Sequence, residues 1–374
     1  MSTTEMLLAR QTKLAQVLQS AGLDALALNP GPTLTYLTGL HFHLMERPFL
    51  LIFAPGKTAA LVLPELEARK IDDLPFQLNA FPYGENPALW PAAFRGAAEA
   101  TGVAGKRVGV EAGQMRVLES NYLSGAALSI ELIPAEKTLA KLRMYKDESE
   151  IAAMRRAAHT AQNALQATLP LVRVGMTEME LAGELVIQLL KHGSSPRIPF
   201  APIVSAGPNS ANPHATPSDR PLTRGDLLLF DWGAAVDEYF SDITRTFALG
   251  PVDAEYAKIH EIVCEANAAA RAVGGPGLPI SAVDKAARAV ITRAGYGPYF
   301  THRTGHGLGM EGHEEPYIRG DNGQLLEPGM TFTIEPGIYL PGRGGVRIED
   351  DVLVTEDGLI SLTDMPRAMQ TLPA

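Results

Sequence analysis

The sequence predicts an α+β protein with two domains: a smaller N-terminal α/β domain and a larger C-terminal domain with a pseudo-two-fold repeat. Three observations support this prediction. Short apolar runs alternate with helical patterns over residues 1–135. Two long helical patterns follow, each after an aspartate, at Asp147 and Asp253. Each of these is followed by a second helical pattern and a β-hairpin with similar residues, so that each half is helix, helix, hairpin.

The composition is that of a folded protein and disfavours a nucleic-acid partner. The 374 residues are 46% hydrophobic and 20% charged, enough to bury the cores of two domains and too apolar for a disordered chain. The formal net charge is −10, and residues 141–374 carry 29 acidic against 21 basic residues. A nucleic-acid-binding protein usually has the opposite sign of charge. The acidic excess instead directs attention to the carboxylates of the C-terminal domain.

The N-terminal domain is expected to cover residues 1–135. Apolar residues at helical spacing predict an amphipathic helix over residues 4–20 that ends at Gly22. A second helix is expected to begin at Pro64, and a third covers 88–100. Strands are predicted at residues 25–28, 49–53, 59–63, 108–111 and 129–132. Residues 136–146 are expected to form a linker to the C-terminal domain, 147–374.

The helices of the C-terminal domain have start signals at similar positions in each half. Asp147 and Asp253 are predicted to precede the first helix of each half, 106 residues apart. Thr177 and Ser281, 104 residues apart, are predicted N-caps of the second helices. Glu180, three residues after Thr177, completes a capping box. The similar offsets favour an internal repeat.

The strands after these helices support the repeat. Gly193 and Gly295 are expected to end the second helices. The segments RGDLLLFDWG (224–233) and PGMTFTIEPG (328–337) follow at a constant offset of 104 residues, which aligns Asp231 with Glu335. Chance similarity of apolar runs is the alternative, but the common order and offset favour a repeat.

Each hairpin is predicted to hold a pair of acidic residues. A turn near residues 236–237 would place Asp231 directly opposite Asp242. A turn over 341–345, centred on Gly342, would place Glu335 opposite Glu349. Facing carboxylates repel each other unless a cation lies between them. Single acidic residues at strand ends are usually turn or cap residues, but two pairs at matching positions favour metal binding.

A histidine is predicted to join these four carboxylates. His306 lies in the segment GHGLG, where Gly305, Gly307 and Gly309 allow the backbone to approach closely. Two divalent ions would balance four carboxylates, and one imidazole favours Mn, Co or Zn over Ca. Phosphate binding by this glycine-rich loop is the alternative, but no GK[ST] follows and the surroundings are acidic.

The remaining sequence features indicate a cytoplasmic protein without a membrane span. The only cysteine, Cys264, lies in an apolar helical pattern typical of a buried, inert thiol. The N-terminal residues carry charges within their apolar pattern and are not expected to be a signal peptide. The sequence contains no run of 18 apolar residues, so no membrane partner is expected.

At these motifs the sequence resembles the metal-dependent Xaa-Pro peptidases of bacterial type, prolidase and aminopeptidase P, which share the pita-bread fold with methionine aminopeptidase. The matching segments are FDWG, SDITRTF, GHGLG, TIEPGIY and VRIEDD, which carry the Asp-Asp-His-Glu-Glu order in full. The resemblance is strong over residues 147–360 and looser over 1–135, where the family has a creatinase-like α/β domain. The chain length and the segment GLGMEGHEEPYI resemble the shorter bacterial prolidases.

This resemblance implies a dinuclear metal centre. The implied ligands are Asp231, Asp242, His306, Glu335 and Glu349, with Asp242 and Glu349 bridging the two ions. Manganese is the expected metal, with cobalt or zinc as alternatives. The resemblance also implies a homodimer.

Further residues are marked for substrate binding or catalysis by the same resemblance: His214, His302, His313 and Tyr339. Arg347 lies two residues before Glu349, on the same strand face, and is expected to steady that carboxylate. The other histidines are expected to have ordinary surface or core roles: His41, His43, His159, His192 and His260.

The implied activity is two-metal hydrolysis of the bond before proline, in a small peptide with proline at its second position. Glu335 is expected to carry a proton from water to the leaving nitrogen, and His313 to donate to the substrate carbonyl. His214 is expected to hold the substrate.

A dipeptide is favoured as the substrate. The alternative is a longer peptide, in which case the protein would be an aminopeptidase P. Arg47 is a candidate for the dipeptide carboxylate if the first domain caps the cleft; otherwise it is an ordinary surface arginine. A creatinase-like enzyme or a scaffold protein would be expected to lack metal ligands, and here none is lost.

Overall fold

The computed structural model describes residues 3–373, which divide into two compact units, one up to Arg143 and one from Met144 onwards. The stretch 136–146, expected to be a linker, instead begins with helix α5 (Glu136–Arg143). This helix belongs to the first unit because Leu139 and Leu142 are buried there. Among the described residues, the helices are all too short or too polar to cross a membrane.

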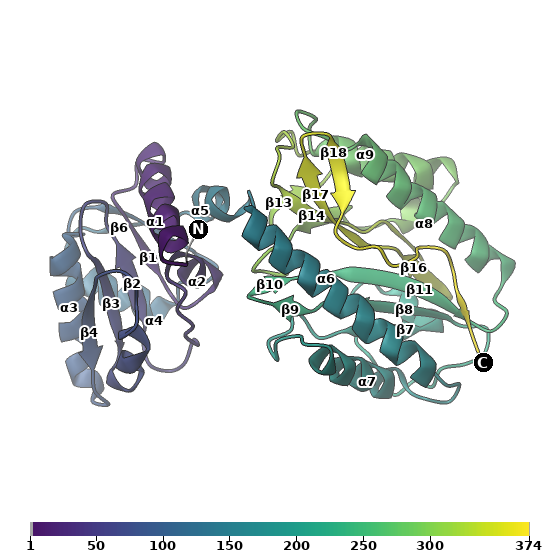
Figure 1. Ribbon diagram of the computed structural model, residues 1–374, viewed down its shortest axis with the longest axis horizontal. Coiled ribbons are helices and arrows are strands. Elements are labelled where there is room, and N and C mark those ends of the chain that lie inside the picture. The colour runs from purple at the N-terminus through teal and green to yellow at the C-terminus, as the bar shows by residue number, and fades with distance from the viewer. Residues whose placement is uncertain (1–2, 374) are drawn as a thin grey trace. The chain divides into compact units, whose positions relative to one another are not determined.

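The first unit is a six-stranded sheet with helices on both faces (Figure 1). The strand order is β4-β3-β2-β1-β5-β6, in which β2 runs antiparallel to both neighbours and the other pairs are parallel. Its elements are α1 (Thr3–Ser20), β1 (Ala25–Leu28), α2 (Pro32–Thr38), β2 (Leu50–Phe53), β3 (Ala59–Pro64), η1 (Glu65–Ile71), β4 (Leu78–Tyr83), η2 (Pro87–Leu89), α3 (Trp90–Thr101), β5 (Arg107–Val110), α4 (Val117–Ala126), β6 (Glu131–Pro134) and α5. The expected α/β fold and its five expected strands are confirmed, and β4 is additional.

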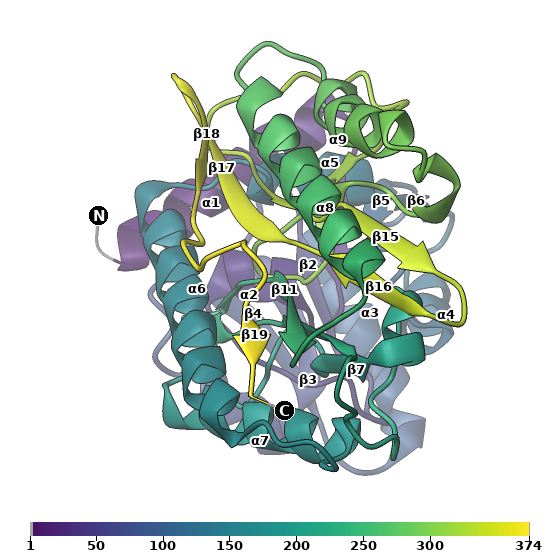
Figure 2. The ribbon, with the colours of Figure 1, turned by 90° about the vertical axis from the view of Figure 1, so that its right-hand side faces the viewer.

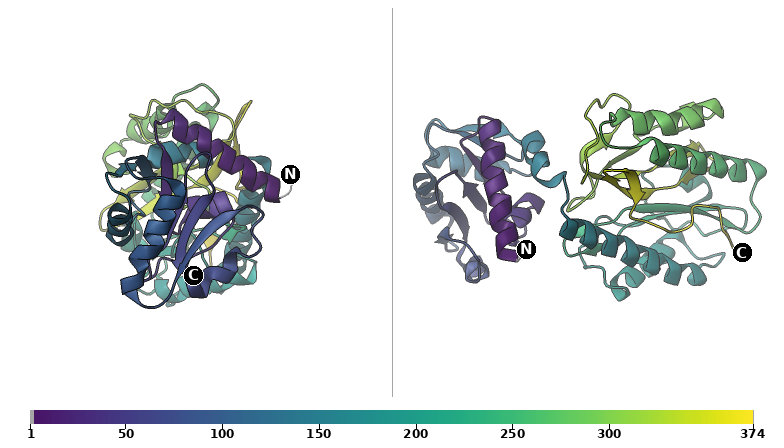
Figure 3. Two further views of the ribbon diagram at one scale, coloured as in Figure 1. Left: turned by 90° about the vertical axis from the view of Figure 1, so that its left-hand side faces the viewer. Right: turned by 45° about the horizontal axis from the view of Figure 1, so that its top comes forward.

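Alternation along β1 explains how both faces of this sheet are covered. Ala25 and Ala27 belong to a core formed with Phe94 of α3 and Leu123 of α4. The intervening residues of β1 face the opposite side, which α1 covers (Figure 3).

The second unit contains the expected repeat. The helix pairs α6–α7 and α8–α9 lie on opposite sides of its strands (Figure 2). Strands β8 and β14 begin at Leu227 and Thr331, 104 residues apart, as the sequence predicts. The elements are α6 (Glu148–Thr168), η3 (Leu169–Leu171), α7 (Glu178–Lys191), β7 (Ile203–Ala206), η4 (Gly207–Ala211), β8 (Leu227–Trp232), β9 (Ala235–Val236), β10 (Tyr239–Phe240), β11 (Ile243–Leu249), α8 (Ala254–Val273), α9 (Ser281–Arg293), η5 (Gly297–Tyr299), β12 (Gly305–Gly307), β13 (Glu314–Ile318), β14 (Thr331–Ile334), β15 (Gly337–Leu340), β16 (Gly344–Arg347), β17 (Asp350–Thr355), β18 (Gly358–Ser361) and β19 (Thr371–Leu372).

Three of the four predicted helix starts are confirmed. Asp147 and Thr177 form full capping boxes, and Asp253 accepts a hydrogen bond from the first turn of α8. The prediction for Ser281 was wrong, because Ile280 occupies the N-cap position and Ser281 is already the first residue of α9. The Ser281 amide bonds to the carbonyl of Asn322, a contact between distant segments.

A buried core fixes the helix pair α6–α7 against strands β7, β8 and β11. Phe230 and Trp232 of β8 pack with Leu165 of α6 and Leu185 of α7. The indole nitrogen of Trp232 donates to the carbonyl of Ala161 at 2.8 Å. Asp231 lies between these two aromatic residues in sequence, so its side chain points to the opposite face of the strand.

Candidate metal centre

The first hairpin presents Asp231 and Asp242 in a register that differs from the expected one. Asp231 lies opposite Thr244, not opposite Asp242. The predicted register was wrong because the turn is formed by Asp237 and Glu238, one residue later, which adopt the positive φ values (49° and 70°) of a tight two-residue hairpin. The error changes the partner by two residues. Since side chains alternate with period two, both aspartates still share one face.

The second hairpin has the expected register. Leu340 pairs with Gly344, so the turn is centred on Gly342, whose φ is 72°. Continuing this pairing places Glu335 opposite Glu349, just beyond the ends of β15 and β16.

His306 reaches the same site from β12, in a segment whose glycines are required by space. A Cβ at Gly305 would lie 1.8 Å from the Thr333 carbonyl oxygen. Corresponding atoms at Gly307 and Gly309 would lie 2.3 and 2.6 Å from oxygen atoms of β13. The expected close approach of the backbone around His306 is confirmed.

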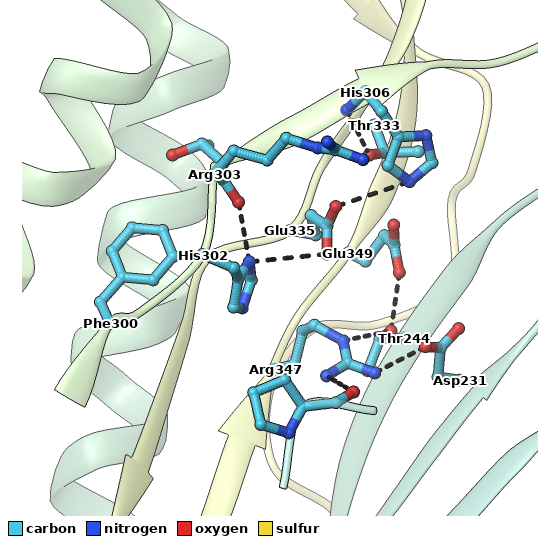
Figure 4. Close-up of polar contacts among 12 residues, drawn as sticks. Asp231, Thr244, Phe300, His302, Arg303, His306, Thr333, Glu335, Arg347 and Glu349 are labelled. Atoms are coloured by element: carbon cyan, nitrogen blue, oxygen red, sulfur yellow. Dashed lines mark hydrogen bonds and ion pairs between the residues drawn. The ribbon is translucent and has the colours of Figure 1, made fainter. Parts of the chain in front are cut away.

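The hairpins and the histidine converge in one buried cluster (Figure 4). His306 Nε2 lies 3.7 Å from Asp242 Oδ2 and 3.5 Å from Glu335 Oε1. One ligand atom from each of Asp242, His306 and Glu349 lies within 4.8 Å of the others. This spacing suits a shared metal ion.

Burial, and then crowding of the carboxylates, raises their pKa values. Burial, followed by the charges of Glu349 and Asp231, raises the pKa of Asp242 well above its usual range. Burial, followed by Glu335 and Asp231, does the same to the pKa of Glu349. Burial raises the pKa of Glu335 to about 7, although Arg347 opposes this. Without metal the cluster must therefore hold protons, which divalent cations would replace.

His306 is prepared to act as a neutral ligand. Burial, and then the neighbouring His313, lowers the pKa of His306 well below its usual value. Nδ1 lies 3.1 Å from the Gly307 carbonyl oxygen, which can only accept a hydrogen bond. Nδ1 therefore carries the proton, and the lone pair of Nε2 faces the carboxylates.

Two buried oxygens provide a separate test of whether these residues fit a metal. Within residues 3–373, Asp231 Oδ1 and Asp242 Oδ1 are buried and accept no hydrogen bond. Buried polar atoms are normally paired, so each has an unused position for a ligand. A donor set of carboxylate oxygens and one imidazole fits divalent ions such as manganese, cobalt or zinc.

Arg347 orients two of the carboxylates. Nη2 donates to Asp231 Oδ2 at 2.6 Å, and Nε donates to Thr244 Oγ1 at 3.0 Å. Thr244 Oγ1 in turn donates to Glu349 Oε2 at 2.7 Å (Figure 4). Arg347 therefore acts on Glu349 through Thr244 rather than by the direct contact expected from the sequence.

Arg347 also connects the cluster to His302. Its Nη1 donates to the Tyr339 hydroxyl at 3.0 Å, and that hydroxyl lies 2.8 Å from His302 Nε2. His302 Nδ1 lies 2.7 Å from the Arg303 carbonyl oxygen, so Nδ1 carries the proton and Nε2 accepts from Tyr339. Burial, followed by Arg347, lowers the pKa of His302 to about 4, and burial raises the pKa of Tyr339 to about 12. Both groups are therefore neutral near pH 7.

His313 and Arg303 lie beside the metal ligand His306. The His306 and His313 rings have centroids 3.9 Å apart. Arg303 Nη2 lies 3.4 Å from His313 Nδ1; an arginine can only donate, so Nδ1 accepts and Nε2 carries the His313 proton. Burial, and then Arg303, lowers the pKa of His313. Figure 4 shows the Arg303 side chain extending towards His306 and Thr333.

Of the two remaining predicted residues, His214 lies near this cluster, where its charge acts on His302 and His313, and Arg47 lies in the first unit. His214 is exposed on the loop after η4 and follows Pro213, whose carbonyl accepts from Arg347 Nη1 at 3.2 Å. Arg47 belongs to the first unit, where its guanidinium pairs with Glu46 and Glu85.

Sequence reasoning missed two residues of the centre, Thr244 and Arg303. A turn placed at residues 237–238 would have put Thr244 opposite Asp231. Arg303 lies three residues before His306 in the same segment, but its side-chain direction depends on packing against Tyr317, 4.4 Å away.

Known proteins share both the fold and nearly the full length of the chain. Residues 152–356 match metallopeptidase family M24, and residues 10–145 match the creatinase/prolidase N-terminal domain. The probable dipeptidase PepE of Mycobacterium tuberculosis is 38% identical over 361 residues, covering 94% of this chain and 93% of that protein.

Two solved structures give the same result. The prolidase of Thermococcus sibiricus has a TM-score of 0.91 and 36% identity, covering 97% of this chain and 98% of its own. The X-Pro aminopeptidase of Thermotoga maritima has a TM-score of 0.84 and 29% identity, covering 97% and 99%. With its pita-bread unit and creatinase-like first domain, the chain belongs to metallopeptidase family M24.

Proposed function

We propose that this metallopeptidase hydrolyses the bond before proline and prefers Xaa-Pro dipeptides. The observation that carries this proposal is the convergence of an acidic cluster and one neutral imidazole, made up of Asp231, Asp242, His306, Glu335 and Glu349. The near full-length likeness to a prolidase supports the preference for proline.

The cluster is proposed to bind two divalent ions, with manganese preferred over cobalt or zinc. Four carboxylates and a single imidazole support a hard or borderline cation. Ions bound there would lower the pKa of a shared water molecule and supply hydroxide near neutral pH. Asp242 and Glu349, whose pKa values are raised by burial and by the neighbouring carboxylates, would hold the ions together with Asp231, His306 and Glu335.

Glu335 and His313 are proposed to move the protons. Glu335 lies beside His306 and His302, where its carboxylate can accept a proton from water and give it to the leaving nitrogen. The proton on His313 Nε2 is available to the carbonyl oxygen of the scissile bond, since Nδ1 accepts from Arg303.

His214, His302 and Tyr339 are proposed to hold the substrate. Proline has no amide hydrogen, so its ring must be recognised by shape rather than by backbone pairing. The rings of His302 and Tyr339, with centroids 5.4 Å apart, offer such a surface next to Glu335, whose Oε2 lies 3.9 Å from His302 Nδ1.

Arg303 is proposed to bind the terminal carboxylate of a dipeptide. The guanidinium of Arg347 is already engaged by Asp231, Thr244 and Tyr339. Arg303 instead lies beside His313, where its charge also acts on Glu335. Arg47 remains an alternative proposal for this role, although its ion pairs favour an ordinary surface position.

The test compares initial rates on Xaa-Pro and Xaa-Pro-Xaa at equal concentration, for the parent protein and Arg303→Gln. The proposal predicts a preference for the dipeptide that Arg303→Gln removes by raising KM for the dipeptide alone. A clear preference of the parent for the tripeptide would instead identify an aminopeptidase P. Creatinase-like and scaffold roles are disfavoured because all five ligand positions are retained.

The protein is further proposed to be a cytoplasmic homodimer. The dimer follows from the family resemblance and is tested by light scattering. The cytoplasmic assignment rests on the single cysteine, Cys264, which cannot form the internal disulfides common in exported proteins.

A further inference from the structure

Two buried carboxylates outside the metal centre occupy similar places in the two halves of the repeat. Glu178 is the first residue of α7, and Asp284 lies in the first turn of α9. Their side chains belong to residues that are 0% and 1% exposed. A helix N-terminus favours a negative charge, but carboxylates this deeply buried also need hydrogen-bond donors.

Glu178 closes the base of the loop that carries His214. Its Oε1 accepts from the Ala206 amide at 2.6 Å, at the end of β7. Its Oε2 accepts from Asn209 Nδ2 at 2.7 Å, and from the amide and hydroxyl of Ser218 at 3.0 and 2.7 Å. One side chain therefore joins both ends of the segment in which His214 lies.

The other side of this loop is held by the strand of Arg347. The Gly345 amide donates to Ser210 Oγ at 2.9 Å, and Arg347 Nη1 donates to the Pro213 carbonyl at 3.2 Å. The loop thus runs between Glu178 at its base and the metal-centre strand β16. The position of His214 depends on both attachments.

Asp284 holds the segment that carries His302 in a comparable way. Its Oδ1 accepts from the Thr304 amide and hydroxyl at 3.2 and 2.7 Å. Both oxygens also accept from Arg288, at 3.0 and 3.1 Å. Arg288 then donates to the carbonyls of Phe300 and His302 at 3.0 and 2.9 Å. The backbone on either side of His302 is therefore attached to Asp284.

We propose that Glu178 and Asp284 are positioning residues for the reaction, Glu178 for His214 and Asp284 for His302. The inference rests on the proposed function, in which these two histidines hold the substrate. Each half of the repeat then uses the same arrangement: a carboxylate in the first turn of its second helix orients one histidine at the site. Glu178 contacts none of the proposed metal ligands, so its loss should displace His214 alone. Asp284 also holds Thr304, whose carbonyl accepts from the Glu335 amide at 2.8 Å, so Glu178 offers the cleaner test.

Glu178→Gln is the principal variant, because glutamine has the same shape but replaces one acceptor oxygen with an NH₂ group. That group must face the amide of Ala206 or the donors of Asn209 and Ser218. The expected result is a fall in kcat/KM of about tenfold on an Xaa-Pro dipeptide, mainly through KM, with unchanged metal content. Asp284→Asn is expected to act similarly.

A double-mutant cycle separates positioning from a general structural effect. In a His214→Ala background, Glu178→Gln should cause no further loss, because its target is already absent. In a His302→Ala background it should cause the same fold loss as in the parent, and Asp284→Asn should show the reverse pattern. Equal losses in both backgrounds, or no loss at all, would overturn the inference.

Two further measurements keep the test decisive. Ser218→Ala removes a single bond to Glu178 and replaces Glu178→Gln in the cycle if that variant does not fold. In the zinc-loaded protein, Glu178→Gln should shift the imidazole NMR resonances of His214 and leave those of His302 unchanged. If the His214 resonances do not move, the inference is contradicted, whether or not the parent protein cleaves Xaa-Pro substrates. A parent protein that cleaves no Xaa-Pro substrate would refute only the proposed function.

Discussion

Arg347 and Asp231 form a buried ion pair that joins the two halves of the repeat at the metal centre. Arg347 lies on β16 and Asp231 on β8, with 2.6 Å between Nη2 and Oδ2 and exposures of 3% and 9%. The same guanidinium donates to the hydroxyls of Thr244 and Tyr339. It therefore sets the position of the Asp231 carboxylate relative to the Tyr339 hydroxyl, which is proposed to face the substrate. Breaking such a buried pair leaves an uncompensated charge and costs about 3–5 kcal/mol.

Arg347→Lys is therefore expected to reduce kcat/KM on an Xaa-Pro dipeptide by about a hundredfold, because a lysine ammonium cannot reproduce the planar set of bonds. Steady-state kinetics and metal analysis check this expectation. Arg343→Lys is the matched control, since Arg343 is an exposed arginine in the turn of the same hairpin. Full activity in Arg347→Lys would show that the arginine does not organise the site.

The carboxylate cluster should contribute less to the stability of the metal-free protein as the pH rises. The pKa values of Asp242 and Glu349 are raised in the folded state, so above about pH 4 the folded protein holds more protons than the unfolded chain. This stabilisation is present at low pH and is lost as the pH rises through the folded pKa, which for Glu335 is about 7.

The melting temperature Tm is measured by thermal unfolding at about pH 5 and about pH 8, once with chelator and once with excess manganese. The increase in Tm caused by metal should be larger at the higher pH, because fewer protons must be displaced. Asp242→Asn should reduce both effects. A metal-free Asp242→Asn protein whose Tm depends on pH in the same way as that of the metal-free parent contradicts the proposed state of the cluster.

A second pH effect, of opposite sign, arises at His260. The residue is 2% exposed, and burial lowers its pKa to about 4. Below its ordinary pKa of 6.5 the unfolded chain takes up a proton that the folded protein does not. Stability present above pH 6.5 is therefore lost as the pH falls towards 4, by up to about 3 kcal/mol.

Urea unfolding of the metal-loaded protein at a series of pH values measures this loss. Between pH 6.5 and pH 4, the free energy of unfolding of His260→Gln should fall less than that of the parent. His159 is exposed, so His159→Gln should behave as the parent. Some sensitivity remains in His260→Gln, because burial lowers the pKa of His302 as well. Identical acid profiles for His260→Gln and the parent would contradict this assignment.

The acidic cluster was predicted correctly although the register of the first hairpin was not, because a register error of two residues leaves every side chain on the same face of the strand. The assumed turn of the first hairpin was one residue early, which moved the partner of Asp231 from Thr244 to Asp242. A shift of two positions keeps every side chain on the same face, so the two aspartates were still assigned together. The glycines around His306 were predictable for a different reason, because only glycine allows the backbone approach seen there.

Features that depend on distant segments were not predictable from local patterns. Ser281 has the residue type of an N-cap, but its amide pairs with Asn322 and the helix begins one residue earlier than expected. Strand β4 is a partly exposed edge strand that contains Pro82, so it lacks the apolar pattern of the other strands. The bonds from Arg347 to Asp231 and Thr244 depend on how the two hairpins pack together.

A metal titration of chelator-treated protein tests the proposed metal centre most directly. Bound ions per chain and the initial rate on an Xaa-Pro dipeptide are measured together. We expect no turnover without metal, full turnover at two ions per chain, and almost none for Asp242→Asn or Glu335→Gln at any metal concentration. Full turnover in a preparation without bound metal would contradict the proposed mechanism.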